Sequence, residues 1–137
     1  MTKNNRYAGF HLIEILIALA LTAIISQWLL GHYQNFIADE RRREAEQALY
    51  ALASALEEYA MANATYAGAT LQNLRVQAII ANNTYELTIN SAQQNDYLVS
   101  ARPLRDQAKI DSRCGKLLLT SAGEKRSTGH DNTQQCW

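Results

Sequence analysis

The chain has 137 residues, of which 47% are hydrophobic and 19% are charged, so it fits one domain of ordinary size and average composition. Its formal net charge of zero excludes a strongly acidic or basic chain, and the part from residue 101 onward is only mildly basic. Composition alone excludes neither an enzyme nor a binding or structural protein.

A long apolar run, Phe10 to Leu30, follows a short basic N-terminus with Lys3 and Arg6. The run has 21 residues, and as a helix it would measure roughly 31 Å, the thickness of a bilayer's hydrocarbon core. We therefore expect a membrane-spanning helix. The basic residues before the run favour a cytoplasmic location of the N-terminus. The arginines at 41–43, beyond the run, leave the orientation ambiguous. Five polar residues interrupt the run: His11, Glu14, Thr22, Ser26 and Gln27.

The helical pattern continues beyond Gly31 with one apolar face. Its members recur at spacings of four, three, four and three residues, which is typical of an amphipathic helix. The cluster Asp39–Glu46 is expected to be a solvated, salt-bridged part of this helix. A stop near Asn63, before Gly68, gives one helix on the order of 80 Å long. The apolar face consists of Ala45, Leu49, Leu52, Leu56 and Tyr59.

The remainder of the chain predicts a small antiparallel sheet. Residues Thr84–Asn90 alternate in polarity, and a polar turn leads into a second strand, Asp96–Ala101, which Pro103 closes. A third strand is expected at Lys116–Ser121, followed by a turn at Gly123. The long helix and the small antiparallel sheet together predict an α+β fold.

Glu14 is the unusual residue of the apolar run. A carboxylate in a spanning helix costs about 2.5–3.5 kcal/mol near the middle of the bilayer, and somewhat less near its edge. Cleavage between Gly9 and Phe10 would convert the nitrogen of Phe10 into an ammonium four residues from Glu14, on the same helix face. That ammonium would pair with Glu14 of its own chain or of a neighbour, and pairing with a neighbour would set the axial register of packed subunits.

The stretch "AGFHLIEILIALALTAIIS" resembles the class III signal of type IV prepilins. The ending "CGKLLLTSAGEKRSTGHDNTQQCW" is similar to the tails of minor pilins of the PilE type. The resemblance implies the type IV pilin fold, a long helical spine packed on a small antiparallel sheet with a C-terminal disulfide loop. It also implies cleavage after Gly9 by a prepilin peptidase, N-methylation of Phe10, and a recruiting and register-setting role for Glu14.

The expected organisation has three parts. Residues 1–9 are a leader peptide, residues 10–31 a transmembrane and filament-core helix, and residues 32–137 a periplasmic head with a three-to-four-stranded sheet. The sequence departs from the family at His11, where relatives usually have Ser or Thr and where an imidazolium would compete for Glu14. It also has Ala23 and Gly31 where many pilins carry a Gly and a Pro that let the helix melt locally.

Cys114 and Cys136 are the two cysteines of the chain. In an oxidising periplasm they are expected to form a disulfide, which would stabilise the fold by about 3 kcal/mol. The alternatives are a zinc site with His130 or a reactive thiol. Two cysteines and one histidine lack a fourth ligand and the usual close spacing, so the sequence favours the disulfide and predicts no metal.

Basic residues of the C-terminal part form a weaker candidate for DNA binding, as in pilins that capture DNA. The candidates are Arg102, Arg105 and Lys109, with Arg113, Lys116, Lys125 and Arg126 further on. Single-strand binding favours aromatic residues among the cations, and here none occurs before Trp137. The nearby acids Asp106, Asp111 and Glu124 weaken the positive electrostatic potential of these residues. A solvated loop surface is therefore the favoured interpretation.

The resulting hypothesis is a structural subunit of a type IV pilus, a minor pilin that helps to initiate or cap the fibre in motility, adhesion or DNA uptake. Its partners would be other pilins, the prepilin peptidase and methylase, and an inner-membrane assembly platform. Before assembly it would reside in the inner membrane, and afterwards in the extracellular fibre. The alternatives are a type II secretion pseudopilin, a pilus-borne DNA receptor and a bitopic interaction protein. No nucleophile, metal cluster or phosphate-binding loop is recognisable, so neither catalysis nor a cofactor is expected.

Overall fold

The computed structural model describes the backbone of residues 12–137 and the side chains of residues 12–27 and 33–137. The chain divides into two compact units, Met1–Gln34, of which residues 12–34 are described, and Asn35–Trp137. Gly9, Phe10 and His11 lie outside the described residues, so what the sequence predicts for them stays a prediction.

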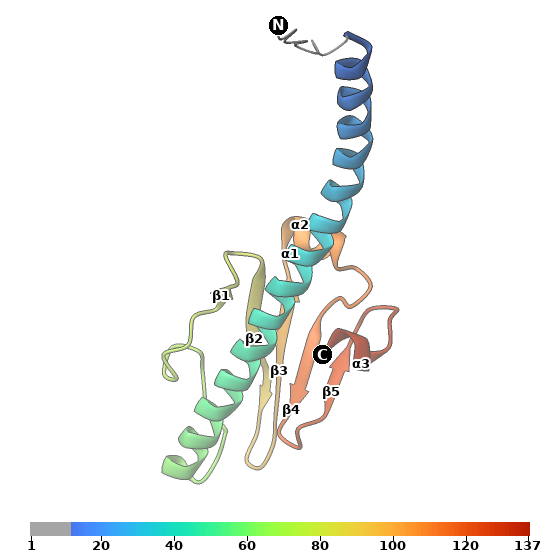
Figure 1. Cartoon of the computed structure of the whole chain (residues 1–137). Coiled ribbons are helices and arrows are strands. Elements are labelled where there is room, and N and C mark those ends of the chain that lie inside the picture. Colours follow the sequence, from blue (N-terminus) through green and yellow to red (C-terminus); the bar gives the residue numbers. More distant parts are fainter. Residues whose placement is uncertain (1–11) are drawn as a thin grey trace, which may run out of the picture. The chain divides into compact units, whose positions relative to one another are not determined.

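Helix α1 (Leu12–Asn63) begins in the first unit and ends in the second (Figure 1). The chain's single proline, Pro103, lies far from this segment, so no main-chain donor is lost within the helix. The predicted end is confirmed. The Asn63 side chain donates a hydrogen bond to the carbonyl of Tyr59 (2.8 Å), and Ala64 adopts a left-handed φ of 59°, which stops the helix.

A five-stranded antiparallel sheet, with its strands in chain order, forms most of the second unit (Figure 1). The three predicted strands are confirmed to within two residues as β2, β3 and β4. The prediction of three to four strands was wrong, because β1 has two residues and β5 has no apolar alternation, so neither gives a periodic signal. The strands are β1 (Ile79–Ile80), β2 (Tyr85–Ala92), β3 (Tyr97–Pro103), β4 (Leu117–Thr120) and β5 (Lys125–Ser127).

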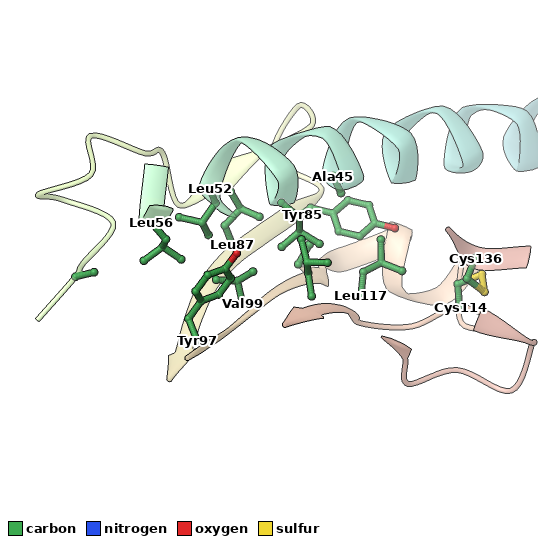
Figure 2. Close-up of a cluster of buried hydrophobic side chains, with 14 residues drawn as sticks. Ala45, Leu52, Leu56, Tyr85, Leu87, Tyr97, Val99, Cys114, Leu117 and Cys136 are labelled. Carbon is green, nitrogen blue, oxygen red and sulfur yellow. A yellow bond between two sulfur atoms is a disulfide. The ribbon is translucent and has the colours of Figure 1, made fainter. Parts of the chain in front are cut away.

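The hydrophobic core lies between α1 and one face of the sheet (Figure 2). The predicted apolar face of the helix is confirmed, since Ala45, Leu49, Leu52 and Leu56 are fully buried and Tyr59 packs against them. Burial of each leucine contributes about 1.5–3 kcal/mol. The sheet residues that meet this face are Tyr85, Leu87, Tyr97, Val99, Ala101, Leu117 and Leu119.

Two short helices complete the second unit. Helix α2 (Arg105–Ile110) follows Pro103, and α3 (Thr133–Cys136) ends at the second cysteine. Neither helix was predicted, because six and four residues are too few to show a helical period. The side chain of Asn132 caps α3 by accepting a hydrogen bond from the amide of Gln134 (3.3 Å).

Cys114 and Cys136 form the expected disulfide, and both cysteines are buried (Figure 2). Their Cα atoms are 5.4 Å apart, in the usual range for a disulfide. Because both sulfur atoms are used in this bond, the zinc alternative with His130 does not apply. The bond holds α3 against the segment that precedes β4.

Gly129, in the loop before α3, lies against the main chain of the segment around Cys114. Its amide donates to the carbonyl of Cys114 (2.9 Å), and a Cβ at this position would lie 1.8 Å from the carbonyl oxygen of Arg113. Gly129→Ala is therefore expected to destabilise the protein by about 1–3 kcal/mol, since main-chain atoms must move. It should also leave a measurable fraction of the cysteines as free thiols. Thermal unfolding and thiol titration measure these two effects.

Gly123→Ala is the matched control for this substitution. Gly123 has φ +76°, and a Cβ there would have nothing within 4 Å. The control should therefore lose some thermal stability through backbone strain, and its disulfide should form completely. If Gly129→Ala were as stable as the unmodified protein and its cysteines were fully oxidised, the close approach at Gly129 would be contradicted.

Candidate functional site

Apolar side chains are exposed all around the first part of α1. Leu12 is 79% exposed and even Ile15, the least exposed of the large ones, is 50% exposed. Such a surface is far more apolar than a soluble helix carries, so it requires an apolar neighbour. Within the part of the chain that the structure describes, no helix combines the length and the hydropathy needed to cross a membrane. The exposed large residues are Leu12, Ile13, Ile15, Leu16, Ile17, Leu19, Leu21, Ile24 and Ile25.

Glu14 lies in the first turn of α1 among these apolar side chains. It is the single ionisable residue among residues 12–27, and its side chain is exposed. A carboxylate near a helix N-terminus interacts favourably with the helix dipole. The processing residues Gly9 and Phe10 lie outside the described residues, so the distance from Glu14 to a new N-terminus remains a prediction.

A buried polar network joins α1 to the sheet in the second unit. The guanidinium of Arg42 donates to the carboxylates of Asp111 and Asp39, the latter at 2.8 Å. The hydroxyl of Tyr85 donates to the other oxygen of Asp111 (2.8 Å). The amide of Gln107 in α2 donates to the carbonyl of Ala38 in α1 (2.9 Å). The network therefore fixes α1 to the turn after α2 by polar contacts as well as by apolar packing.

The pKa values of the network reflect its burial. Burial raises the pKa of the Asp111 carboxyl, and hydrogen bonds from Tyr85 and Arg42 only partly offset this effect. Burial also raises the pKa of the Tyr85 hydroxyl, and the negative charge of Asp111 raises it further. Burial by itself would lower the pKa of Arg42, but Asp111 and Asp39 more than compensate and raise it. Attraction within the pair thus favours the charged form of Arg42, whereas burial outweighs that attraction at Asp111 and disfavours its charged form.

This network corrects the expectation that Asp39–Glu46 is a solvated segment. The side chain of Arg42 is only 11% exposed, whereas that of Arg43 is 71% exposed and lies 4.0 Å from Glu40. Within Asp39–Glu46, only Glu40, Arg43 and Glu44 are exposed as predicted.

The three candidate DNA-binding residues lie close together in the sequence, at the end of β3 and in α2. Their charges are partly neutralised, because Arg102 pairs with Glu86 on the neighbouring strand β2, and Lys109 lies 3.4 Å from Asp106. All three residues are exposed, and Arg105 begins α2 with a φ of 50°. The structure therefore places two arginines and a lysine on one accessible stretch.

Two of the further basic residues, Lys125 and Arg126, have local partners. The ammonium of Lys125 lies over the rings of Tyr50 and Trp137, 5.4 and 5.3 Å from their centroids. Arg126 forms an ion pair with Glu124 at 2.7 Å. Lys125 thus packs against the C-terminal Trp137, and the charge of Arg126 is balanced by Glu124.

Comparison with known proteins identifies the family. The model of the family described as "Type IV minor pilin ComP, DNA uptake sequence receptor" matches residues 31–118, well over half of the chain. The matched part contains most of the core of the second unit and the candidates Arg102, Arg105 and Lys109. No curated protein matches the chain.

A solved structure is also similar, the non-core minor pilin PilV of Neisseria meningitidis. The sequence identity is 17% and the TM-score is 0.49, over 68% of this chain and 91% of PilV. The family match favours a type IV pilus over the alternative of a type II secretion pseudopilin. The chain belongs to this family of type IV minor pilins and is a structural subunit of type IV pili, which associates with other pilins in the fibre.

Proposed function

We propose that this minor pilin joins the fibre through residues 10–31 and helps to initiate or cap it, with Glu14 setting the register. The observation that supports this proposal is the apolar surface of residues 12–27, which is exposed on all sides and interrupted by one carboxylate. In a bilayer that surface is covered by lipid, and in a fibre by neighbouring helices. Assembly then exchanges one apolar environment for another and requires an external motor, which an inner-membrane assembly platform supplies.

The proposed life cycle begins in the inner membrane with a cytoplasmic N-terminus. A prepilin peptidase removes residues 1–9 and methylates Phe10, and the head, residues 32–137, lies in the periplasm until the subunit enters the extracellular fibre. The buried disulfide between Cys114 and Cys136 is compatible with that oxidising compartment.

Intact-mass measurement of the protein from its native membrane tests the processing step. We expect a chain that starts at Phe10 and carries one additional methyl group. Gly9→Leu should leave the chain uncut, because a bulky side chain replaces the small residue before the cut. A native protein that retains its first nine residues would rule out the proposed ammonium partner of Glu14, and with it the register mechanism.

A second candidate function is DNA binding, favoured by the family model whose description names a DNA uptake sequence receptor. The candidate contacts are the accessible cations Arg102, Arg105 and Lys109. Cations that neutralise phosphates release condensed counterions, so their contribution appears in the salt dependence of binding. The acids Glu86 and Asp106 must then release their partners to a phosphate, which lowers the gain per contact.

Replacing Arg102, Arg105 and Lys109 together by Gln is expected to weaken the binding of duplex DNA. The slope of the logarithm of the binding constant against the logarithm of the salt concentration should become shallower by up to about three. Gel shifts at several salt concentrations measure both quantities. The charge-matched control replaces Arg113, Lys116 and Arg126 by Gln. If the two triple variants bind equally, the 102–109 stretch is not the DNA site.

A further inference from the structure

Helix α2 is fixed beside the first turn of the part of α1 that belongs to the second unit (Figure 1). The side-chain amide of Gln107 donates to the carbonyl of Ala38 (2.9 Å), and Gln107 is buried. Arg105 and Lys109 each lie two residues from Gln107 and four residues from each other, so they share the face of α2 opposite to Gln107. Both are exposed. Helix α2 therefore presents a pair of cations close to Ala38.

Ala38 follows closely on the segment proposed to span the membrane, residues 10–31. Residues 32–38 belong to α1, and seven helical residues measure roughly 10 Å. The headgroup layer on each side of a bilayer is about 5–7 Å thick. With residues 10–31 in the hydrocarbon core, Ala38 lies a few ångströms outside the headgroups. Long cationic side chains beside it can reach the lipid phosphates.

Exposed aromatic side chains precede Ala38 in α1. Phe36 is 66% exposed, and Tyr33, three residues earlier in the chain, is 62% exposed. Tyrosine is enriched where helices leave the bilayer, and phenylalanine is among the residues that interfacial helices bury between headgroups and acyl chains. The phosphates of a nucleic acid offer such rings no comparable environment. An exposed aromatic ring together with a pair of cations therefore favours a lipid surface at this end of the second unit.

The acids of α1 in this region have cationic partners of their own. Asp39 is paired with Arg42 at 2.8 Å, and Glu40 lies 4.0 Å from Arg43. Helix α2 contains one acid, Asp106, which lies 3.4 Å from the lysine of the cation pair. Two cations and one acid leave α2 with a net charge of +1. Its exposed face is therefore complementary to the phosphates of anionic lipids.

We propose that α2 binds the phosphate groups of anionic phospholipids through Arg105 and Lys109 while the subunit resides in the membrane. This inference rests on the proposed function, in which residues 10–31 span the inner membrane before assembly. It adds a contact between the head and the bilayer surface to the burial of the apolar helix. The contact ends when the subunit leaves the membrane for the fibre.

Amide hydrogen exchange of α2 measures this contact. The full chain is reconstituted in nanodiscs of phosphatidylcholine, with or without phosphatidylglycerol as the anionic lipid. The amides of Ala108 and Asp111 are hydrogen-bonded within α2, so they report on its opening. One net cationic charge at an anionic surface corresponds to about a fivefold gain, and exchange at these amides should therefore slow about fivefold in the anionic discs.

Variants with altered charge separate the cations of α2 from the charge of the whole chain. Replacing Arg105 and Lys109 together by Gln should remove the difference between the two kinds of disc. The matched control replaces Arg75, which follows α1, and Arg126, in β5, by Gln, and it should retain the difference. Asp106→Asn removes the one acid of α2 and should enlarge the difference about another fivefold. Equal effects of the two double variants would overturn the proposal.

The outcomes distinguish this proposal from the one on which it rests. Co-elution of the chain with the discs shows insertion. If the chain inserts but its α2 amides exchange equally fast in both kinds of disc, the lipid contact is overturned and the membrane stage stands. If the chain inserts into neither, the membrane stage fails and the lipid contact fails with it. Slower exchange on addition of duplex DNA to neutral discs, without any slowing by anionic lipid, would assign the two cations to DNA and also overturn the proposal.

Discussion

Replacing Arg42 by Ala is expected to lower the free energy of unfolding by about 3–5 kcal/mol, because it leaves the buried carboxylate of Asp111 without its cation. The side chain of Asp111 is only 3% exposed, so its carboxylate has little contact with solvent to compensate for the lost guanidinium. A domain of this size has about 5–15 kcal/mol of stability in total. Denaturant unfolding of the full chain in detergent measures the loss.

Arg43→Ala is the control for this prediction. Arg43 is adjacent in sequence and identical in chemistry, but its pair with Glu40 is exposed, and such pairs contribute about 0–1 kcal/mol. In the double variant Arg42→Ala with Asp111→Ala, the loss should be smaller than the sum of the two single losses, because neither charge is left alone. Additive losses would show that the two side chains do not interact in the folded protein.

The contrast between Arg42 and Arg43 shows what the sequence could not provide. Both belong to one charged run, and no local pattern separates them. Arg42 differs from Arg43 because the fold brings Asp111, 69 residues away, to its guanidinium. Gln107 was missed for the same reason, since α2 is too short to predict and its contact with Ala38 is equally distant in sequence.

Local periodicity, in contrast, was sufficient for much of the architecture. The spacing of Ala45, Leu49, Leu52 and Leu56 predicted the buried face of α1, and alternation predicted β2, because each pattern repeats within its element. Strands β3 and β4 were predicted as short segments bounded by turn residues. The two-residue strand β1 offers no repeat. The left-handed turn at Arg75, which precedes it, could not be predicted from residue types.

Glu14 belongs to a third category, in which the sequence predicted a role that depends on a later chemical event. Glu14→Ala is expected to reduce incorporation into fibres roughly a hundredfold relative to the membrane pool. The physical reason is that the ammonium of Phe10 then enters the fibre core unpaired, at a cost of about 2.5–3.5 kcal/mol, where each 1.4 kcal/mol is a factor of ten. Insertion into the membrane should not decline, because removing a carboxylate makes the helix more apolar.

Immunoblots of sheared fibres and of membranes from the same cells separate these two effects. Glu14→Gln keeps the size of the side chain without its charge, so a loss close to that of Ala would assign the effect to the charge rather than to packing. Glu44→Ala removes an exposed carboxylate from the part of the same helix that belongs to the second unit, and it should leave incorporation into fibres unchanged. If Glu14→Ala enters fibres at the wild-type ratio, the carboxylate does not set the register, and the apolar side chains of residues 12–27 must determine the axial position by packing alone.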